Sequence, residues 1–248
     1  MERDNWDQHW LDCIEASDHY NPGVSYRRRI ISRMLQIEPN RAGCRLVELG
    51  SGTGQFAGDF CPRFPLVNFL GLDISQEGVG RARRRVRTAR FEVCDLLQPL
   101  TDGEILRFGA THALCSEVLE HVDHPEELLR NASSLMAPGC RVVVTVPGGP
   151  MTTFDKHIGH RRHYSPQDLR SLLRAAGYDV EKTGGFGFPF YNLYRLALLS
   201  RGAGLVQMVS GPPSLSIRAG YYTFETLCRL NLDWWGWQTV GIARWLGQ

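Results

Sequence analysis

The stretch RLVELGSGTGQF, residues 45–56, decides the fold of this chain. Residues 46–49 are apolar except for Glu48, which is typical of a buried parallel strand, and glycines follow at alternating positions. Glycine lets the backbone adopt a positive φ and lets a ligand approach where a Cβ would collide. The pattern therefore predicts a strand, a tight turn and a bound nucleotide-like molecule.

The acid within this strand indicates what kind of ligand the turn accepts. A carboxylate at Glu48 repels a pyrophosphate and attracts a cationic group. A dinucleotide-binding G-x-G-x-x-G motif would also have glycine where Gln55 stands. Both features argue against an oxidoreductase that uses a nicotinamide cofactor.

Length and composition suit a single α/β domain of 248 residues. The net charge of +2 gives no argument for a nucleic-acid partner. The seven cysteines are scattered, with no C-x-x-C pair, which favours reduced thiols in a cytoplasmic protein. The charged start of the chain and the lack of any 18-residue apolar run predict neither secretion nor a membrane span.

Further apolar runs alternate with helical patterns after the glycine turn. We expect strands at 67–73, 90–95, 111–117 and 141–147, a sixth strand from Tyr178 and a last strand at 237–244. Helices are expected at 76–89, 125–136 and 166–176. The arginines of 81–90 are expected to face solvent, with a surface that docks a polyanion as the alternative. This order predicts a seven-stranded, mainly parallel sheet with helices on both faces and ligands at the carboxyl ends of the strands.

Residues 5–37 are expected to form helices with a break at 21–23. The arginines at 27–29 are expected to face solvent. Two interpretations of the aromatic residues of this segment stay open, packing in the core or a lid over a substrate, and they concern Trp6, Trp10, Tyr20 and Tyr26.

Four motifs in register carry a resemblance to a known family. ELGSGTG at 48–54, LDIS at 72–75, CDL at 94–96 and SEVLEHV at 116–122 resemble the successive motifs of class I S-adenosylmethionine-dependent methyltransferases. The resemblance covers roughly residues 40–185 and the last strand. It implies a Rossmann-like α/β fold with S-adenosyl-L-methionine as cofactor and S-adenosyl-L-homocysteine as product.

The resemblance also implies where the cofactor binds. The glycine turn would pass under the methionine part, and its cationic end explains why an acid is tolerated there. Acids after the second and third strands would hold the ribose hydroxyls and the adenine amino group. The residues so implied are Glu48, Gly50, Ser51, Gly52, Gly54, Asp73, Ile74, Asp95 and Leu96, with Ser116 and Glu117 near the sulfonium. A catalytically silent binding protein is a remote alternative. Such a protein has no need of these acids, so their presence argues against it.

A loop at 155–164 is expected to follow the carboxyl end of the fifth strand. It ends where Ser165 and Pro166 start the next helix. Its pattern GHxRxYS is similar to one found in a broad group of bacterial small-molecule methyltransferases. Among the histidines a general base is one alternative, with His160 first and His157 and His121 behind it; structural use and metal ligation are the others. We expect no metal, since the intervals match no ligand pattern and no nearby carboxylate pair completes a shell.

The connection between the last two strands is unusually long. We divide the single domain into a helical cap (1–40), a cofactor-binding core (41–186), an insertion (187–235) and the last strand with its tail (236–248). The insertion is expected to form an acceptor pocket or lid, a dimer interface or a membrane contact, in that order. Candidate substrate contacts are Tyr26, Arg162, Tyr164, Phe188 and Tyr191.

The expected reaction is in-line methyl transfer to oxygen, nitrogen or carbon of a small aromatic or otherwise apolar acceptor, by a monomer or homodimer. A lipid or polyprenyl acceptor at a membrane surface is the alternative, because the insertion is apolar and aromatic.

Overall fold

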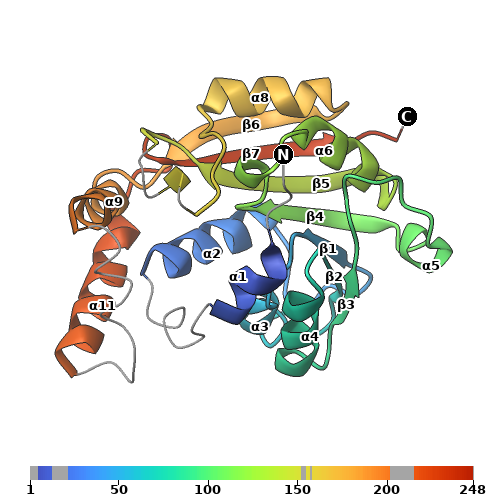
Figure 1. The fold of residues 1–248 in the computed structure, drawn as a ribbon, viewed down its shortest axis with the longest axis horizontal. Coiled ribbons are helices and arrows are strands. Elements are labelled where there is room, and N and C mark those ends of the chain that lie inside the picture. The colour runs from blue at the N-terminus through green and yellow to red at the C-terminus, as the bar shows by residue number, and fades with distance from the viewer. Residues whose placement is uncertain (1–4, 13–21, 152–154, 157, 202–214, 248) are drawn as a thin grey trace.

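A seven-stranded sheet forms the centre of the protein (Figure 1). The computed structural model describes residues 5–12, 22–151, 155–156, 158–201 and 215–247. The strand order is β3-β2-β1-β4-β5-β7-β6, in which β7 runs antiparallel to both of its neighbours and the other pairs are parallel. The strands are β1 (Arg45–Leu49), β2 (Asn68–Asp73), β3 (Arg90–Val93), β4 (Ala110–Ser116), β5 (Met136–Pro147), β6 (Asp179–Phe186) and β7 (Gln238–Trp245). The predicted mainly parallel sheet is confirmed.

Two apolar layers cover the sheet because successive strand side chains point to opposite faces. In β1, Val47 and Leu49 join one layer and Leu46 the other. The first layer includes α6 (Pro125–Ser133) and α8 (Pro166–Ala175), and the second includes α2 (Pro22–Leu35), α3 (Gln55–Phe60) and α4 (Gln76–Arg85). The sheet is thus buried on both faces, with its carboxyl edge free for a ligand.

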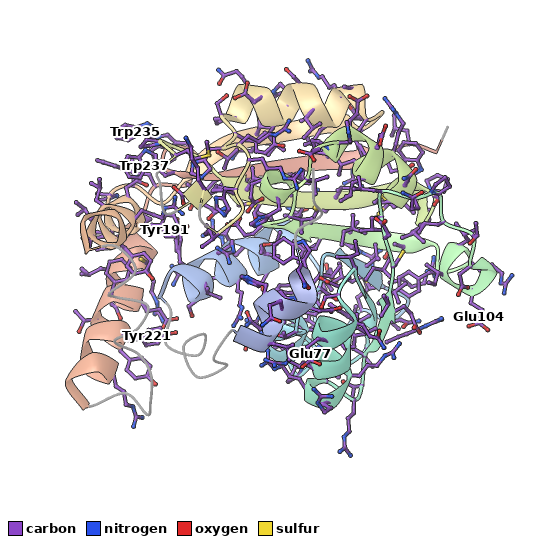
Figure 2. The ribbon with its side chains drawn as sticks, viewed as in Figure 1. Glu77, Glu104, Tyr191, Tyr221, Trp235 and Trp237 are labelled. Carbon is purple, nitrogen blue, oxygen red and sulfur yellow. The ribbon has the colours of Figure 1, made fainter. Side chains whose placement is uncertain are left out.

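The remaining helices include α1 (Trp6–Asp12), which packs against α4, and the helices of the insertion. Besides α1 they are α5 (Gly103–Leu106), η2 (Leu119–His121), α9 (Phe190–Arg201), α11 (Leu215–Leu227) and η3 (Cys228–Leu230). The insertion helices α9 and α11 pack beside α2 rather than on the sheet (Figures 1 and 2). No helix in the described ranges is long and apolar enough to cross a membrane.

The boundary between α6 and β5 differs from the prediction. The helix ends at Ser133 and the strand begins at Met136, whereas a helix to residue 136 and a strand from 141 are the expected elements. Ser133 and Ser134 hydroxyls donate to backbone carbonyls one turn back, which ends the helix early. An irregularity in β4 between Ala110 and His112 then absorbs the extra paired residues of β5.

Two predictions about helix starts have different outcomes. Ser165 caps α8 in a reciprocal capping box with Asp168, as the sequence indicates. The expected break at 21–23 is wrong in part, because Pro22 and Gly23 form the first turn of α2, a position that suits proline.

Candidate functional site

A cavity of about 680 Å³ opens at the carboxyl ends of β1, β2 and β4. It is lined by nearly all residues that the sequence motifs assign to the cofactor: Glu48, Gly50, Ser51, Gly52, Asp73, Ile74, Asp95, Leu96, Ser116 and Glu117. Gly54 packs against α4 instead, where a Cβ would lie 2.9 Å from that of Ala82. The motifs, far apart in sequence, therefore meet around one space.

The glycine turn has a fixed shape that other residues cannot adopt. Gly50 and Gly52 have φ values of 76° and 50°. The amides of Gly50 and Ser51 both donate to the Leu72 carbonyl. A Cβ on Gly50 would lie 2.3 Å from Val118, so glycine is required for space as well as for conformation.

Asp73 links the turn to the start of α4. Its carboxylate accepts the Gly52 amide at 2.7 Å and the Ser75 amide at 2.9 Å, and the side chain is buried. Burial raises the pKa of Asp73, although these backbone donors oppose the rise. An ionised carboxylate offers about four acceptor positions, so Asp73 can still accept hydrogen bonds from ribose hydroxyls.

Glu48 carries a buried carboxylate on the cavity wall. The residue is 4% exposed, and its Oε2 has no hydrogen-bond partner among the described residues. Burial raises the pKa of Glu48 well above its usual range, partly countered by the nearby charge of Arg28. Because burying a polar atom without a partner is costly, a cationic ligand group fits this position.

Helix α1 closes one side of the cavity. Trp6 and Trp10 line the space, and the Trp10 ring lies against Gly52. The Asp7 carboxylate accepts the Glu77 amide at 3.0 Å and the Ser75 hydroxyl, which fastens α1 to the start of α4. The lid interpretation therefore fits the two tryptophans; Tyr20 lies outside the described residues.

A polar network extends the cavity beyond β4. Glu117 follows the strand with φ 56°, a conformation that a side chain rarely adopts without a functional or structural demand. Its carboxylate accepts from Arg27 at 3.3 Å and from Gln238 at 3.0 Å. The Tyr191 hydroxyl donates to Gln238 at 2.9 Å. The network therefore joins α2, β4, β7 and α9 at one point. Local sequence patterns do not reveal these contacts, because the segments lie far apart in the chain.

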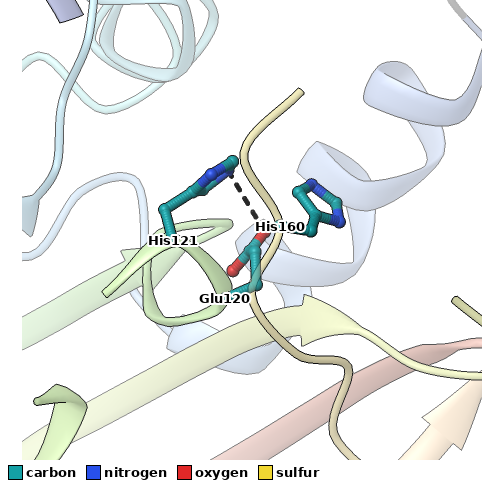
Figure 3. Close-up of side chains that lie close together, drawn as sticks. All are labelled: Glu120, His121 and His160. Carbon is teal, nitrogen blue, oxygen red and sulfur yellow. Dashed lines mark ion pairs between the residues drawn. The ribbon is translucent and has the colours of Figure 1, made fainter. Parts of the chain in front are cut away.

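The histidines form a second cluster, and they are not equivalent. His121 lines the cavity, and the His160 ring packs against it at a centroid distance of 4.8 Å (Figure 3). His160 Nδ1 lies 3.1 Å from His163 Nε2. Burial, with the neighbouring histidines, lowers the pKa of His160 to about 4, and burial also lowers the pKa of His163. His157 lies outside the described residues.

Two carboxylates lie next to these histidines, which the sequence does not predict. Asp155 is 3.8 Å from both His160 and His163, and Arg195 of α9 lies 3.4 Å from it. Glu120 is fully buried, its Oε1 lies 4.0 Å from His121 Nε2, and neither carboxylate oxygen has a hydrogen-bond partner within the described structure. Burial raises the pKa of Glu120 well above its usual range.

The expected substrate contacts lie away from the described cavity wall. The rings of Tyr26 and Tyr191 pack together in the core, and the Tyr164 hydroxyl donates to the Leu119 carbonyl. Phe188 packs against Trp235 in the insertion, and Arg162 donates to the Asp123 carbonyl. The reason is common to these residues: each satisfies a packing or hydrogen-bonding need inside the fold.

Neighbouring residues take the cavity positions instead. Arg161 lines the cavity and is ion-paired with Asp123, and Ile158 lies on the wall beside it. Arg27 of α2 also reaches the cavity, although its helical pattern predicts a solvent-facing side chain. The sequence gives no signal for this position, because Arg27 is the first of three consecutive arginines.

Comparison with known proteins places this site in a wider context. A model of a family described as "Methyltransferase domain" matches residues 18–183. The trans-aconitate 2-methyltransferase of Methylobacterium nodulans is 32% identical over 123 residues, which are 49% of this chain and 45% of that protein. The malonyl-[acyl-carrier protein] O-methyltransferase of Dechloromonas aromatica is 26% identical over 231 residues, 86% of this chain and 82% of that one.

Solved structures show the same fold. A SAM-dependent methyltransferase from Archaeoglobus fulgidus superposes with a TM-score of 0.59 and 20% identity, covering 96% of this chain and 100% of that one. The chain spans only part of the length of some curated relatives: 45% of the trans-aconitate 2-methyltransferase of Methylobacterium nodulans and 40% of an uncharacterized 37.1 kDa protein of Streptomyces fradiae.

Proposed function

Because its methyltransferase domain extends over residues 18–183, this chain belongs to the class I S-adenosylmethionine-dependent methyltransferases, and we propose that it methylates a small-molecule acceptor. One observation carries the proposal. A single cavity is lined both by the glycine turn, Glu48 and Asp73 and by Trp6, Glu117 and His121, and we assign the first set to a cofactor end and the second to an acceptor end. Its volume lies within the range of about 300–1,000 Å³ that small-molecule sites have.

The residues at the first end fit the cofactor. The unpartnered Oε2 of Glu48 suits the cationic methionine end, and the Asp73 carboxylate suits the ribose hydroxyls. Asp95 and Leu96 line the part of the wall that the family motifs give to adenine. When bound, the cofactor supplies an electrophilic methyl group on a positively charged sulfur.

The residues at the other end orient the acceptor and exclude water. Trp6, Ile31 and Ile158 give this part an apolar wall, and the ion-paired guanidinium groups of Arg27 and Arg161 add hydrogen-bond donors. We therefore propose an acceptor with an apolar or aromatic body and a polar group that faces His121. Orientation of the reacting atoms supplies roughly 7–11 kcal/mol in reactions of this kind, more than a general base does.

His121 is our candidate for the general base, ahead of His160. His121 lies on the cavity wall, whereas His160 lies behind it and its lowered pKa makes it a weak base. We expect His121→Asn to lower kcat by a factor of about 10² while S-adenosylhomocysteine binding stays within twofold. If kcat of His121→Asn equals that of the wild type, His121 is not the general base.

The test of the proposed function has two steps. Isothermal titration should detect S-adenosylmethionine binding by the wild type, and Asp73→Ala should weaken this binding by at least about 10-fold, since two charge-assisted contacts are lost. A screen of phenols, carboxylic acids and amines with labelled cofactor then identifies the acceptor class. Failure to bind the cofactor refutes the proposal, and so does binding that is unaffected in Asp73→Ala.

A second candidate function is methylation of a lipid or polyprenyl acceptor at a membrane surface. One observation favours it: Leu230, Trp234 and Trp235 of the insertion are 68%, 70% and 58% exposed. Tryptophan is enriched where proteins meet the membrane–water interface. We expect flotation with anionic liposomes if this function holds, and loss of flotation in a Trp234→Ser/Trp235→Ser double variant. If the wild-type protein does not float with the liposomes, this candidate function is excluded.

A further inference from the structure

A group of buried side chains behind the cavity wall has the composition of a metal site. Asp155, His160 and His163 each point a ligand atom toward the others, and these atoms lie within 4.8 Å of one another. Their side chains are only 2%, 7% and 6% exposed. We propose that Asp155, His160 and His163 bind a divalent first-row transition ion, with Zn²⁺ as the ion that suits them best.

The distances between the ligand atoms support this proposal. His160 Nδ1 and His163 Nε2 are 3.1 Å apart. His160 Nδ1 is 3.8 Å from Oδ1 of Asp155, and His163 Nε2 is 3.8 Å from Oδ2 of the same carboxylate. Ligand atoms bound about 2.1 Å from one tetrahedral ion lie about 3.4 Å from each other. The histidine nitrogens are close to this separation, and a small rotation of the Asp155 carboxylate is needed to bring one of its oxygens to the ion.

The surroundings of His163 fix its ligating nitrogen. His163 Nδ1 lies 3.2 Å from the Gly149 carbonyl oxygen, which can only accept a hydrogen bond. The ring therefore carries its proton on Nδ1, and Nε2, which faces His160 and Asp155, presents a lone pair. His160 Nδ1–H donates to this lone pair at 3.1 Å, so His160 binds the ion in its other tautomer, with the proton on Nε2. Histidine ligands of metal sites are oriented by the same kind of contact to a backbone carbonyl or carboxylate.

The charges near the site are of both signs. Arg195 lies 3.4 Å from one oxygen of Asp155 and offsets part of the negative charge of that carboxylate. Glu120 adds negative charge near His160, and it is buried and without a hydrogen-bond partner among the described residues. A set of two histidines and one carboxylate favours zinc or a related ion over magnesium or calcium, which prefer oxygen ligands.

The position of the site in the chain indicates what the ion does. Asp155 and His163 flank Ile158 and Arg161 in the sequence, and both of these residues line the cavity. A metal bound to Asp155 and His163 holds the two flanks together and thereby fixes the cavity wall at Ile158 and Arg161. The ion is a structural clamp that needs no part in the methyl transfer.

Untagged, full-length protein stripped with EDTA provides the test. We expect titration with Zn²⁺ to show one bound ion, and Co²⁺ to give visible d–d bands without a strong sulfur charge-transfer band. His163→Gln and Asp155→Asn should each weaken Zn²⁺ binding by at least about 100-fold. His124→Asn, which changes an exposed histidine outside the group, should bind like the wild type.

A second measurement separates a clamp from incidental binding. Trypsin should cleave after Lys156 and Arg161 at least about 10-fold more slowly with Zn²⁺ in the wild type, and at the same rate with and without Zn²⁺ in His163→Gln. S-adenosylhomocysteine binding by the variants serves as the check that they are folded. The proposal is overturned by a wild type that binds no Zn²⁺, by equal binding in both variants, or by binding lost in Glu120→Gln alone.

Discussion

Gln238, in the last strand of the sheet, donates a hydrogen bond of 3.0 Å to the carboxylate of Glu117, which directly follows β4. The same amide group accepts from the Tyr191 hydroxyl at 2.9 Å through its oxygen, and Gln238 is fully buried. One side chain of β7 therefore holds both the strained end of β4 and the first turn of α9. The acceptor end of the cavity depends on this strand although β7 contributes no described residue to its wall.

Gln238→Leu should destabilise the protein by about 1–3 kcal/mol, because a carboxylate and a hydroxyl lose their buried partner. Tyr191→Phe should cost less, since it removes only one hydrogen bond. Urea unfolding of the two single variants and the double variant measures the coupling between the residues. A coupling energy of zero would show that the hydrogen bond contributes nothing to stability.

Asp7→Ala should loosen the α1 lid. The Asp7 carboxylate holds α1 to the first turn of α4 through the Glu77 amide and the Ser75 hydroxyl. Losing these charge-assisted contacts should raise the dissociation rate of S-adenosylhomocysteine about 10-fold. Tryptophan fluorescence reports this rate, since Trp6 and Trp10 line the cavity.

The control for the lid is Leu11→Ala, a change at a side chain of the same helix that is 57% exposed. It should leave the dissociation rate unchanged. Equal rates for the wild type and Asp7→Ala would show that α1 does not retain the cofactor.

Glu48→Gln should make the ligand-free protein more stable and cofactor binding weaker. A neutral amide removes the cost of burying a charged carboxylate but keeps one polar atom without a described partner, so we expect a gain of about 1 kcal/mol. The same change removes the attraction for the cationic end of the cofactor, and we expect roughly 10-fold weaker binding. Glu38→Gln, at an exposed site, is the control. Lower stability together with unchanged affinity contradicts the assignment of Glu48.

The stability of the protein should fall on acidification because of His112. Burial, with the charge of Arg141, lowers the pKa of His112 to about 4, from an ordinary value of 6.5. Between these pH values the unfolded chain binds a proton that the folded protein does not, so the contribution of His112 decreases as pH falls from 6.5 to 4. The loss amounts to at most about 3 kcal/mol.

Denaturant unfolding of the wild type and His112→Gln at pH 7 and pH 4.5 isolates this effect from other titrating groups. The wild type should lose more stability than the variant over this interval. Parallel losses would show that His112 titrates normally in the folded protein.

The glycine turn and the strands around it could be predicted because their signals are local. Apolar runs, an acid at the end of β2 and glycines at alternating positions need no knowledge of distant contacts, and the structure places them around one cavity. The start of β5 was missed because serine side chains end α6 early, a choice that helical periodicity does not show.

The acceptor side could be predicted only as a region. The motif GHxRxYS indicates the correct loop, but Tyr164 is used to bind the Leu119 carbonyl and Arg161 rather than Arg162 reaches the cavity. The expectation of no metal depends on the intervals between the histidines and on the lack of a nearby carboxylate pair, and it stays a prediction. The sequence does not show that Asp155 and Glu120 both lie near His160, because this depends on how residues 158–163 meet η2.

The position of β7 has a consequence for the order in which the protein is made. Strand β7 lies between β5 and β6 and pairs with both, yet it is synthesised after them. Until its residues leave the ribosome, the facing edges of β5 and β6 have no partner in this sheet, and unpaired strand edges invite association between chains. During synthesis the chain therefore passes through a stage in which the edges of β5 and β6 are exposed and are targets for chaperones. A chain that is terminated before β7 would keep these edges exposed.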